Sequence, residues 1–414
     1  MLAPERRTRA DIFAAIAIAV TVLVAAIVVW ARADATGTES VVSDSPAPTV
    51  VAATELPAAL QEQWHAADSA SARALVAGNV VVTGDEGTVS GRDPLTGEQL
   101  WWYHRDMPLC GVETQYGAVI ATYRDQRGCS QTIMLAADTG ARSIARSSYL
   151  DDTVSLSGDG TYLLALGPQR LELWRSDLVR TLEYGYVDAP VNPNTQPRTG
   201  CALRSAASSS TRLAVLERCP QDPTARLTVL KPAPKEATDP EEYGSRVLTA
   251  PGAEAPEVRV LAVSENKVAV YYPPVPATAS GLAAPARLVV HDGTGNEIAT
   301  HPLAAPWSDR TTVTRLGKAL YVFTGESVIS LDSSTLQPMW TVPGALGTPA
   351  RMAGELLVPV VGGLHAVDPA DGAVVARIPV QRSDYHGDTI STAALGSTVF
   401  ERRGGRLYAL AALS

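Results

Sequence analysis

Aromatic and charged residues are scarce in this 414-residue sequence, and the charges that it has are mostly acidic. Aromatic side chains make up 6% of the chain and charged side chains 19%. The 34 Lys and Arg residues are outnumbered by 43 Asp and Glu residues, which gives a formal net charge of −9. Proteins that bind nucleic acids neutralise the phosphates with clustered Lys and Arg side chains. The acidic balance therefore argues against a nucleic-acid partner.

Short catalytic motifs are also missing from the sequence. It contains no G-x-S-x-G elbow, no Walker loop and no dinucleotide-binding fingerprint. The histidines are spread along the chain without the H-x-x-x-H spacing of a metal site. They are His65, His104, His291, His301, His365 and His386. We therefore assign no catalytic residue, no metal ligand and no cofactor, and we expect a protein that is not an enzyme.

Only four cysteines are present, Cys110, Cys129, Cys201 and Cys219. Four cysteines allow three disulfide connectivities, and the sequence alone does not choose among them. The similar spacings of 19 and 18 residues favour two local pairs, 110–129 and 201–219, each joining neighbouring strands of one repeat. A metal site is the alternative, but the C-x-x-C spacing and nearby histidines that zinc sites use are missing.

A single long apolar run extends from Ile12 to Trp30 without a charged residue. As a helix it would be roughly 28 Å long, which matches the hydrocarbon thickness of a bilayer. Arg6, Arg7 and Arg9 precede the run, so the positive-inside rule places the N-terminus in the cytoplasm and the rest of the chain outside. The alternative is a cleaved signal peptide, because residues 31–33 read Ala-Arg-Ala, although such apolar segments are usually shorter.

These features divide the chain into four parts. We expect a cytoplasmic tail over residues 1–11, a transmembrane helix over 12–30 and a flexible stalk over 31–57. The stalk is rich in Ala, Ser, Thr and Pro and has no periodicity, which is typical of a linker. Residues 58–414 form the folded region. The four cysteines lie in this region, in a compartment where disulfides persist.

An internal repeat runs through residues 58–414. The clearest copy, residues 78–103, has an apolar strand, a turn, a second strand, a D-x-x-T-G turn and a strand that carries tryptophan. Further copies start near residues 117, 160, 211, 266, 317 and 354. In the turn, Asp accepts hydrogen bonds from the following backbone and Gly supplies a positive φ. Repeats of this length indicate a β-propeller, in which each copy is a four-stranded blade.

The two ends of the repeat region complement each other. Residues 397–413 supply strands without the outer strand that carries tryptophan. Leu60-Gln-Glu-Gln-Trp64 resembles Leu336-Gln-Pro-Met-Trp340, and both precede an Ala-Gly pair at the same spacing. We therefore expect the strand around Trp64 to complete the last blade and close the ring, which removes an exposed sheet edge. This predicts an all-β, eight-bladed propeller; seven blades are the alternative, because the fourth and fifth copies diverge.

The segments GNVVVTGDEGTVSGRDPLTGEQLWWY and GLHAVDPADGAVVARI resemble PQQ-like β-propeller repeats. The expected ring closure is similar to that of BamB-like outer-membrane assembly lipoproteins and of quinoprotein dehydrogenases. The Ala- and Val-rich composition and the single N-terminal helix resemble actinobacterial membrane-anchored proteins with this fold. Quinoprotein dehydrogenases use adjacent cysteines and a calcium ligand set. No two cysteines are adjacent here, so the resemblance implies the fold without the enzyme's cofactor site.

A rigid ring on a membrane tether, with long polar loops, is typical of a binding protein, because such loops usually carry binding. We expect a non-enzymatic binding or scaffold protein of the cell envelope, single-pass in the cell membrane, with envelope or membrane proteins as partners. The alternatives are a PQQ-dependent oxidoreductase and an extracytoplasmic ligand sensor.

Overall fold

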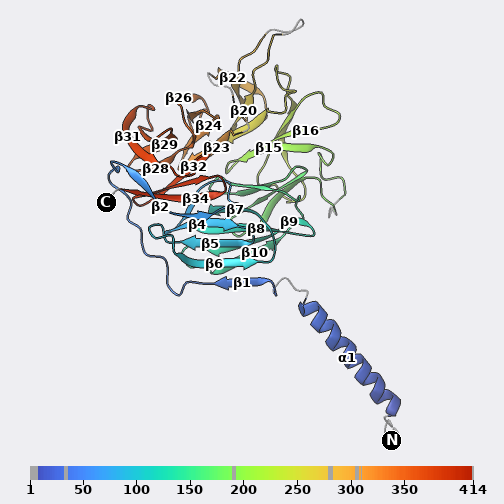
Figure 1. The fold of residues 1–414 in the computed structure, drawn as a ribbon. Coiled ribbons are helices and arrows are strands. Elements are labelled where there is room, and N and C mark those ends of the chain that lie inside the picture. Colours follow the sequence, from blue (N-terminus) through green and yellow to red (C-terminus); the bar gives the residue numbers. More distant parts are fainter. Residues whose placement is uncertain are drawn as a thin grey trace.

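The computed structural model describes residues 8–31, 36–188, 193–277, 283–303, 307–308 and 310–412. One helix, α1 (Arg9–Ala31), precedes a region built of strands, and it extends away from these strands in Figure 1. Thr8 caps the helix, because its hydroxyl accepts a hydrogen bond from the backbone N–H of Asp11 at 3.3 Å. Residues 1–7 of the expected tail and 32–35 of the expected stalk lie outside the described residues.

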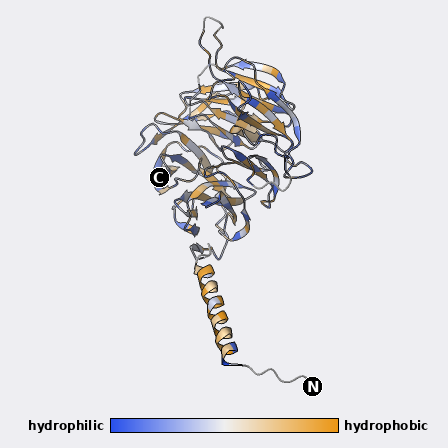
Figure 2. Ribbon diagram, turned by 90° about the vertical axis from the view of Figure 1, so that its right-hand side faces the viewer, coloured by the Kyte–Doolittle hydropathy of each residue, from blue (hydrophilic) through white to orange (hydrophobic). Residues whose placement is uncertain are grey.

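Helix α1 is apolar on all sides, as Figure 2 shows, and none of its residues is buried. Its 23 residues give a length of about 34 Å. It is therefore long and apolar enough to cross a bilayer, although a signal sequence near an N-terminus would meet the same two criteria.

The strands form four-stranded antiparallel units in which consecutive strands are neighbours. The first unit contains β3 (Leu75–Ala77), β4 (Val80–Asp85), β5 (Thr88–Arg92) and β6 (Gln99–Arg105). The second contains β7 (Leu109–Gln115), β8 (Ala118–Asp125), β9 (Gly128–Ala136) and β10 (Arg142–Ser147). The third contains β11 (Ser155–Gly158), β12 (Leu163–Leu166), β13 (Arg170–Trp174) and β14 (Arg180–Gly185). The next contains β15 (Ala202–Ser208), β16 (Leu213–Arg218), β17 (Arg226–Leu230) and β18 (Glu242–Val247).

The remaining units follow the same order along the chain. The next two contain β19 (Arg259–Val263), β20 (Lys267–Tyr272), β21 (Arg287–Asp292) and β22 (Glu297–Pro302), then β23 (Thr312–Leu316), β24 (Ala319–Phe323), β25 (Ser327–Leu331) and β26 (Pro338–Pro343). A nine-stranded sheet contains β27 (Gly347–Thr348), β28 (Ala350–Met352), β29 (Glu355–Val360), β30 (Gly363–Val367), β31 (Val374–Gln381), β32 (Ile390–Leu395), β33 (Thr398–Arg403), β34 (Arg406–Ala412) and β2 (Leu60–Ala67).

Packing between consecutive units holds the ring together. The middle strands are buried on both faces, as in β4 and β29, because a neighbouring unit covers each face. Outer strands such as β10 and β22 alternate between more and less exposed residues, as expected for strands with one solvated face. Each hydrophobic cluster joins two consecutive units, and one cluster joins Phe400 of β33 to Val81 of β4. The clusters therefore form a closed ring.

Strand β2 closes the ring by pairing antiparallel with β34, from Leu60 opposite Ala412 to Ala67 opposite Arg406. This is the pairing that the sequence predicts for the strand around Trp64. A short parallel contact between Leu60 and Val380 links β2 to β31 and makes the two last units one continuous sheet. The N- and C-terminal parts of the ring are thus hydrogen-bonded to each other.

Tryptophans on outer strands cover the glycine of the D-x-x-x-G turn in the next unit. A Cβ atom on Gly97 would lie 2.5 Å from the Trp64 ring, and one on Gly372 would lie 2.8 Å from the Trp340 ring. Both glycines have positive φ angles, so a side chain would be excluded there by the backbone as well. A third contact of this kind joins Trp101 and Gly140. The Trp64–Gly97 contact braces the seam where the ring closes.

The segment after α1 is part of the folded region rather than a free linker. Strand β1 (Thr38–Val41) pairs antiparallel with β6 and lies along the outside of the first unit in Figure 1. Farther along, the N–H of Ala47 donates to the carbonyl of Asp138 at 3.2 Å, and Ala47 is buried. The expectation of a flexible stalk over residues 31–57 is therefore wrong for this part. The outer edge of β6 offers unpaired backbone groups, and β1 satisfies them.

Candidate functional site

A cavity of about 620 Å³ lies where the first strands of the units converge. Residues of β11, β15, β19 and β23 line it on one side, and residues near β3, β7 and β32 line it on the other. We call it the central channel. Its volume lies in the range of about 300–1,000 Å³ that is typical of small-molecule sites. Hydroxyl groups are frequent in its wall, at Ser155, Ser157, Ser205, Ser208, Thr311, Thr312, Thr314, Thr348, Thr389 and Ser391.

Two arginines of the central channel are paired with carboxylates. Arg73 forms an ion pair with Glu113, whose side chain is 5% exposed. Arg402 lies 3.7 Å from the buried carboxylate of Asp68. That carboxylate also accepts hydrogen bonds from the Ser71 hydroxyl at 2.5 Å and from the Gly84 N–H at 2.9 Å. Burial nevertheless raises the pKa of Asp68 to about 6, because desolvation outweighs these contacts.

A second cavity of about 320 Å³ lies between loops of the second and third units. Its two arginines are already paired, Arg127 with Asp125 at 2.8 Å and Arg170 with Glu172 at 2.7 Å. Asp151 and Asp188 also line this cavity, which has about half the volume of the central channel and takes its wall from two units only. The central channel is therefore the stronger candidate site.

Glu172 is the centre of a buried ion-pair network in the third unit. Its carboxylate contacts the guanidinium groups of Arg146, Arg170 and Arg180 at 3.2, 2.7 and 3.2 Å. It also accepts hydrogen bonds from the Trp174 indole N–H at 2.8 Å and from a serine hydroxyl. Burial alone would raise the pKa of Glu172, but the three guanidinium groups outweigh it and hold the pKa below its usual value. Arg170 and Arg180 also form ion pairs with Glu183, so two buried carboxylates face three guanidinium groups and every charge in the network contacts an opposite charge. The network therefore has a structural role.

The structure contains the two expected cysteine pairs as disulfides, Cys110–Cys129 and Cys201–Cys219. Cys201 and Cys219 flank β15 and β16, which are neighbouring strands as expected. Cys110 on β7 and Cys129 on β9 lie on either side of β8, so this disulfide bridges three strands instead of two neighbours. Strand β8 ends at Asp125, and the turn after it brings β9 level with the start of β7.

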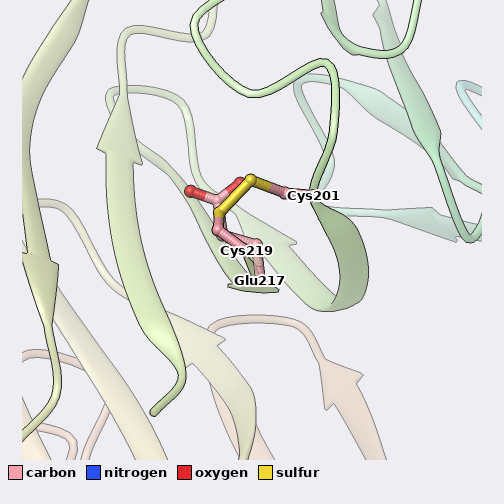
Figure 3. Close-up of side chains that lie close together, drawn as sticks. All are labelled: Cys201, Glu217 and Cys219. Carbon is pink, nitrogen blue, oxygen red and sulfur yellow. A yellow bond between two sulfur atoms is a disulfide. The ribbon is translucent and has the colours of Figure 1, made fainter. Parts of the chain in front are cut away.

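Figure 3 shows Cys201, Cys219 and Glu217 side by side, with the two sulfur atoms bonded to each other. Their ligand atoms lie within 4.8 Å of one another, as they would at a metal site. Thiolates are the form of cysteine that binds metals, and the disulfide leaves none here. The Glu217 carboxylate accepts hydrogen bonds from Tyr184 at 3.0 Å and Thr228 at 2.6 Å, so its buried oxygens are already used.

Trp101, a tryptophan of the first repeat, has a structural role. The Trp101 indole is buried and donates to the Ala137 carbonyl at 2.7 Å, so it connects two units. The loop before β32 lies beside the central channel, because the Gly387 carbonyl accepts a hydrogen bond at 3.4 Å from the channel residue Arg310.

The arginines of the central channel are candidate binding residues that the sequence analysis did not single out. Arg204 lies on β15 and Arg315 on β23, both first strands. The signal that would have found them is the repeat itself. Because the first strand of every copy lies nearest the axis, a charged residue on it can face the channel, as Arg204 and Arg315 do, although Arg259 of β19 and Arg351 of β28 do not.

No protein-family model and no curated protein matches this chain. Solved structures do: the computationally designed Ika8 protein is 14% identical, covers 86% of this chain and 99% of its own, and gives a TM-score of 0.53. The C-terminal WD40 domain of Sif2 is 10% identical, with coverages of 87% and 100% and a TM-score of 0.52. BamB from Moraxella catarrhalis is 15% identical over 85% and 99%, but its TM-score of 0.48 is too low to support an argument. These likenesses show an all-β propeller fold and nothing about function.

Proposed function

We propose that this chain is a membrane-anchored binding or scaffold protein whose propeller holds a ligand or partner outside the cytoplasm. The observation that carries the proposal is the central channel, where polar and charged side chains from most of the units converge on one cavity of about 620 Å³. A propeller that served only as a spacer would have no need of this concentration of polar groups at its axis. In this proposal α1 is the anchor and the ring is the binding module.

The number of blades and the orientation of the chain in the membrane are part of the same proposal. Counting β32, β33, β34 and β2 as one unit, the ring has eight blades of four strands. The two disulfides support an extracytoplasmic ring, because disulfides persist in oxidising compartments and are rare in the cytosol. The N-terminus is then cytoplasmic and the single pass is α1, as in the PQQ-like membrane proteins that the sequence resembles.

The proposal is tested with the full chain, purified in a neutral detergent and used as bait in extracts of cell envelopes. A bait made of residues 1–31 and the same affinity tag is the control, because it keeps the membrane helix and removes the ring. We expect an envelope protein or wall component to be enriched on the full chain alone. Equal recovery on both baits would contradict the proposal.

We further propose that the ring carries out no catalysis. The expectation is tested by titrating the full chain with PQQ and Ca²⁺ and following the reduction of an electron-acceptor dye. A flat titration is the expected result. Saturable dye reduction that depends on PQQ would contradict this part of the proposal and favour an oxidoreductase.

A further inference from the structure

The charge of the central channel is opposite in sign to that of the molecule. The chain has a formal net charge of −9, yet five arginines and only two acidic residues line the channel. The five are Arg73, Arg204, Arg310, Arg315 and Arg402. A cavity lined with one sign of charge and walled by protein focuses the electric field on ligands of the other sign. The channel therefore attracts anions although the protein as a whole repels them.

Three of these arginines lack a carboxylate partner in the part of the chain that the structure describes. Arg310 donates to the Gly387 carbonyl at 3.4 Å and Arg315 to the Val263 carbonyl at 3.5 Å, both uncharged groups. Arg204 is exposed in the channel. Their guanidinium groups remain largely hydrated, so their positive charge is available to a ligand.

The backbone directs Arg204 into the channel. The pairing of β15 with β16 shifts register between Leu203 and Ser205, which makes Arg204 the extra residue of a β-bulge. Bulges turn a side chain away from the regular alternation of a strand. Arg204 lies four residues before the end of β15, and Arg73 lies four residues before the end of β3. The two arginines are therefore at the same level of the channel.

Arg402 lies at this level of the channel, and Arg310 lies beyond it. Arg402 is opposite Ser391, which precedes the end of β32 by four residues. Arg310 precedes the start of β23 by two residues and therefore lies farther out. By register, Arg73, Arg204 and Arg402 lie at one level of the channel, Arg310 lies beyond them, and Arg315, one residue before the end of β23, lies toward the opposite end.

Guanidinium groups bind carboxylate and phosphate oxygens through paired N–H donors. Hydroxyl groups such as those of Ser205 and Thr311 lie in the same wall and supply further donors to oxygen atoms. We propose that the central channel binds a small organic or inorganic molecule with several negatively charged oxygens, carried by phosphate or carboxylate groups. This inference rests on the proposed binding function and names the chemistry of its ligand.

The test is isothermal titration calorimetry of the full chain in neutral detergent and a phosphate-free buffer. Pyrophosphate and citrate are the two probes, and glucose is the uncharged control. We expect one molecule of pyrophosphate or citrate to bind per chain, more weakly as the salt concentration rises, and glucose not to bind. Binding of pyrophosphate alone assigns phosphate chemistry, and binding of citrate alone assigns carboxylate chemistry. No binding of either anion would overturn the inference.

The double variant Arg204→Gln, Arg310→Gln tests whether the anion binds in the channel. We expect its affinity to fall at least tenfold, because two of the hydrated guanidinium groups are lost. Arg142→Gln is the matched control, since Arg142 is an exposed arginine on the outer strand β10, away from the channel. Equal affinity of the double variant and the wild type would show an adventitious ion only and overturn the inference. The envelope capture experiment is independent of this result, so the two proposals fail separately.

Discussion

Two groups of arginines in this molecule differ in what neutralises them. In the third unit, Arg170 and Arg180 contact Glu172 and Glu183, and the side chains of both glutamates are almost completely buried. In the central channel, Arg204, Arg310 and Arg315 make no ion pair within the described residues, although they line one cavity. The first group is packed against buried carboxylates, and the second group is exposed to solvent.

The difference separates charges that are neutralised within the fold from charges that stay available to a ligand. A guanidinium group inside a protein needs a carboxylate, because an unpaired buried charge costs several kcal/mol. A guanidinium group that faces a hydrated channel has no such requirement, and it does not stabilise the fold. Arginines gathered in a channel are therefore best explained by a ligand.

The largest predicted effect is in the buried network. Glu172→Gln leaves Arg146, Arg170 and Arg180 with one carboxylate fewer in a buried site, so we expect the free energy of unfolding to fall by about 3–5 kcal/mol. Denaturant unfolding of the full chain measures this change. Glu297→Gln, at an exposed position of β22, is the matched control and should change stability little. A loss for Glu172→Gln as small as that of the control would contradict the structural role of the network.

The Cys201–Cys219 disulfide, which lies beside the buried Glu217, is also predicted to stabilise the fold. Replacing Cys201 and Cys219 together by Ala should lower the free energy of unfolding by about 3 kcal/mol, because the bond closes a loop of this length in the unfolded chain. Channel binding should be unchanged. A double variant that is as stable as the wild type would show that the bond does not constrain the unfolded chain.

Asp68 shares a property with each group of arginines. It is buried, like the network around Glu172, and it contacts Arg402, which lines the central channel. The pKa of Asp68 is raised to about 6, above the value near 3.9 of an unfolded chain. The folded protein therefore holds a proton that the unfolded chain has lost, between pH 4 and 6. The stability that this group contributes is present below about pH 4 and is lost as the pH rises through about 6.

Asp68→Asn removes this titration. The difference in unfolding free energy between wild type and variant should change by about 2 kcal/mol between pH 4 and pH 7, with the wild type relatively less stable at pH 7. Thermal or denaturant unfolding across this range measures it. If the unfolding free energies of the two proteins changed with pH in the same way, the account of Asp68 would be contradicted.

The smallest predicted effect is in the central channel. Arg204→Gln combined with Arg310→Gln should change the free energy of unfolding by no more than about 0.5 kcal/mol, the range typical of surface substitutions. Denaturant unfolding beside the Glu172→Gln variant gives the comparison directly. A loss of several kcal/mol would place these arginines in the structural group and remove the contrast.

The repeat and its closure were predictable because they depend on local sequence. Asp93 and the glycine four residues later specify a turn, and the carboxylate of Asp93 accepts the N–H groups of Leu95 and Thr96 at 2.8 Å, as expected. The match between the segments at Trp64 and Trp340 predicted that β2 completes the last unit. The similar cysteine spacings favoured the pairs that the structure contains.

Other features could not be predicted, because they depend on contacts between segments that are far apart in the sequence. Residues 38–41 have the composition of a linker, and they form β1 because the edge of β6 is available. The bulge at Arg204 arises from the register between two strands, which the sequence of one strand does not reveal. The partners of Glu172 come from β10, β13 and β14, and only the packing of the second unit against the third brings them together.

The central claim is that the hydrated arginines of the channel bind an anion with several charged oxygens. Crystals of the full chain soaked in tungstate, a strongly scattering oxyanion, test it most directly through the anomalous difference density. We predict a peak within the central channel beside Arg204 and Arg310 that is missing in crystals of the double variant. Peaks confined to arginines on the outer surface, such as Arg142, with an empty channel would contradict the claim.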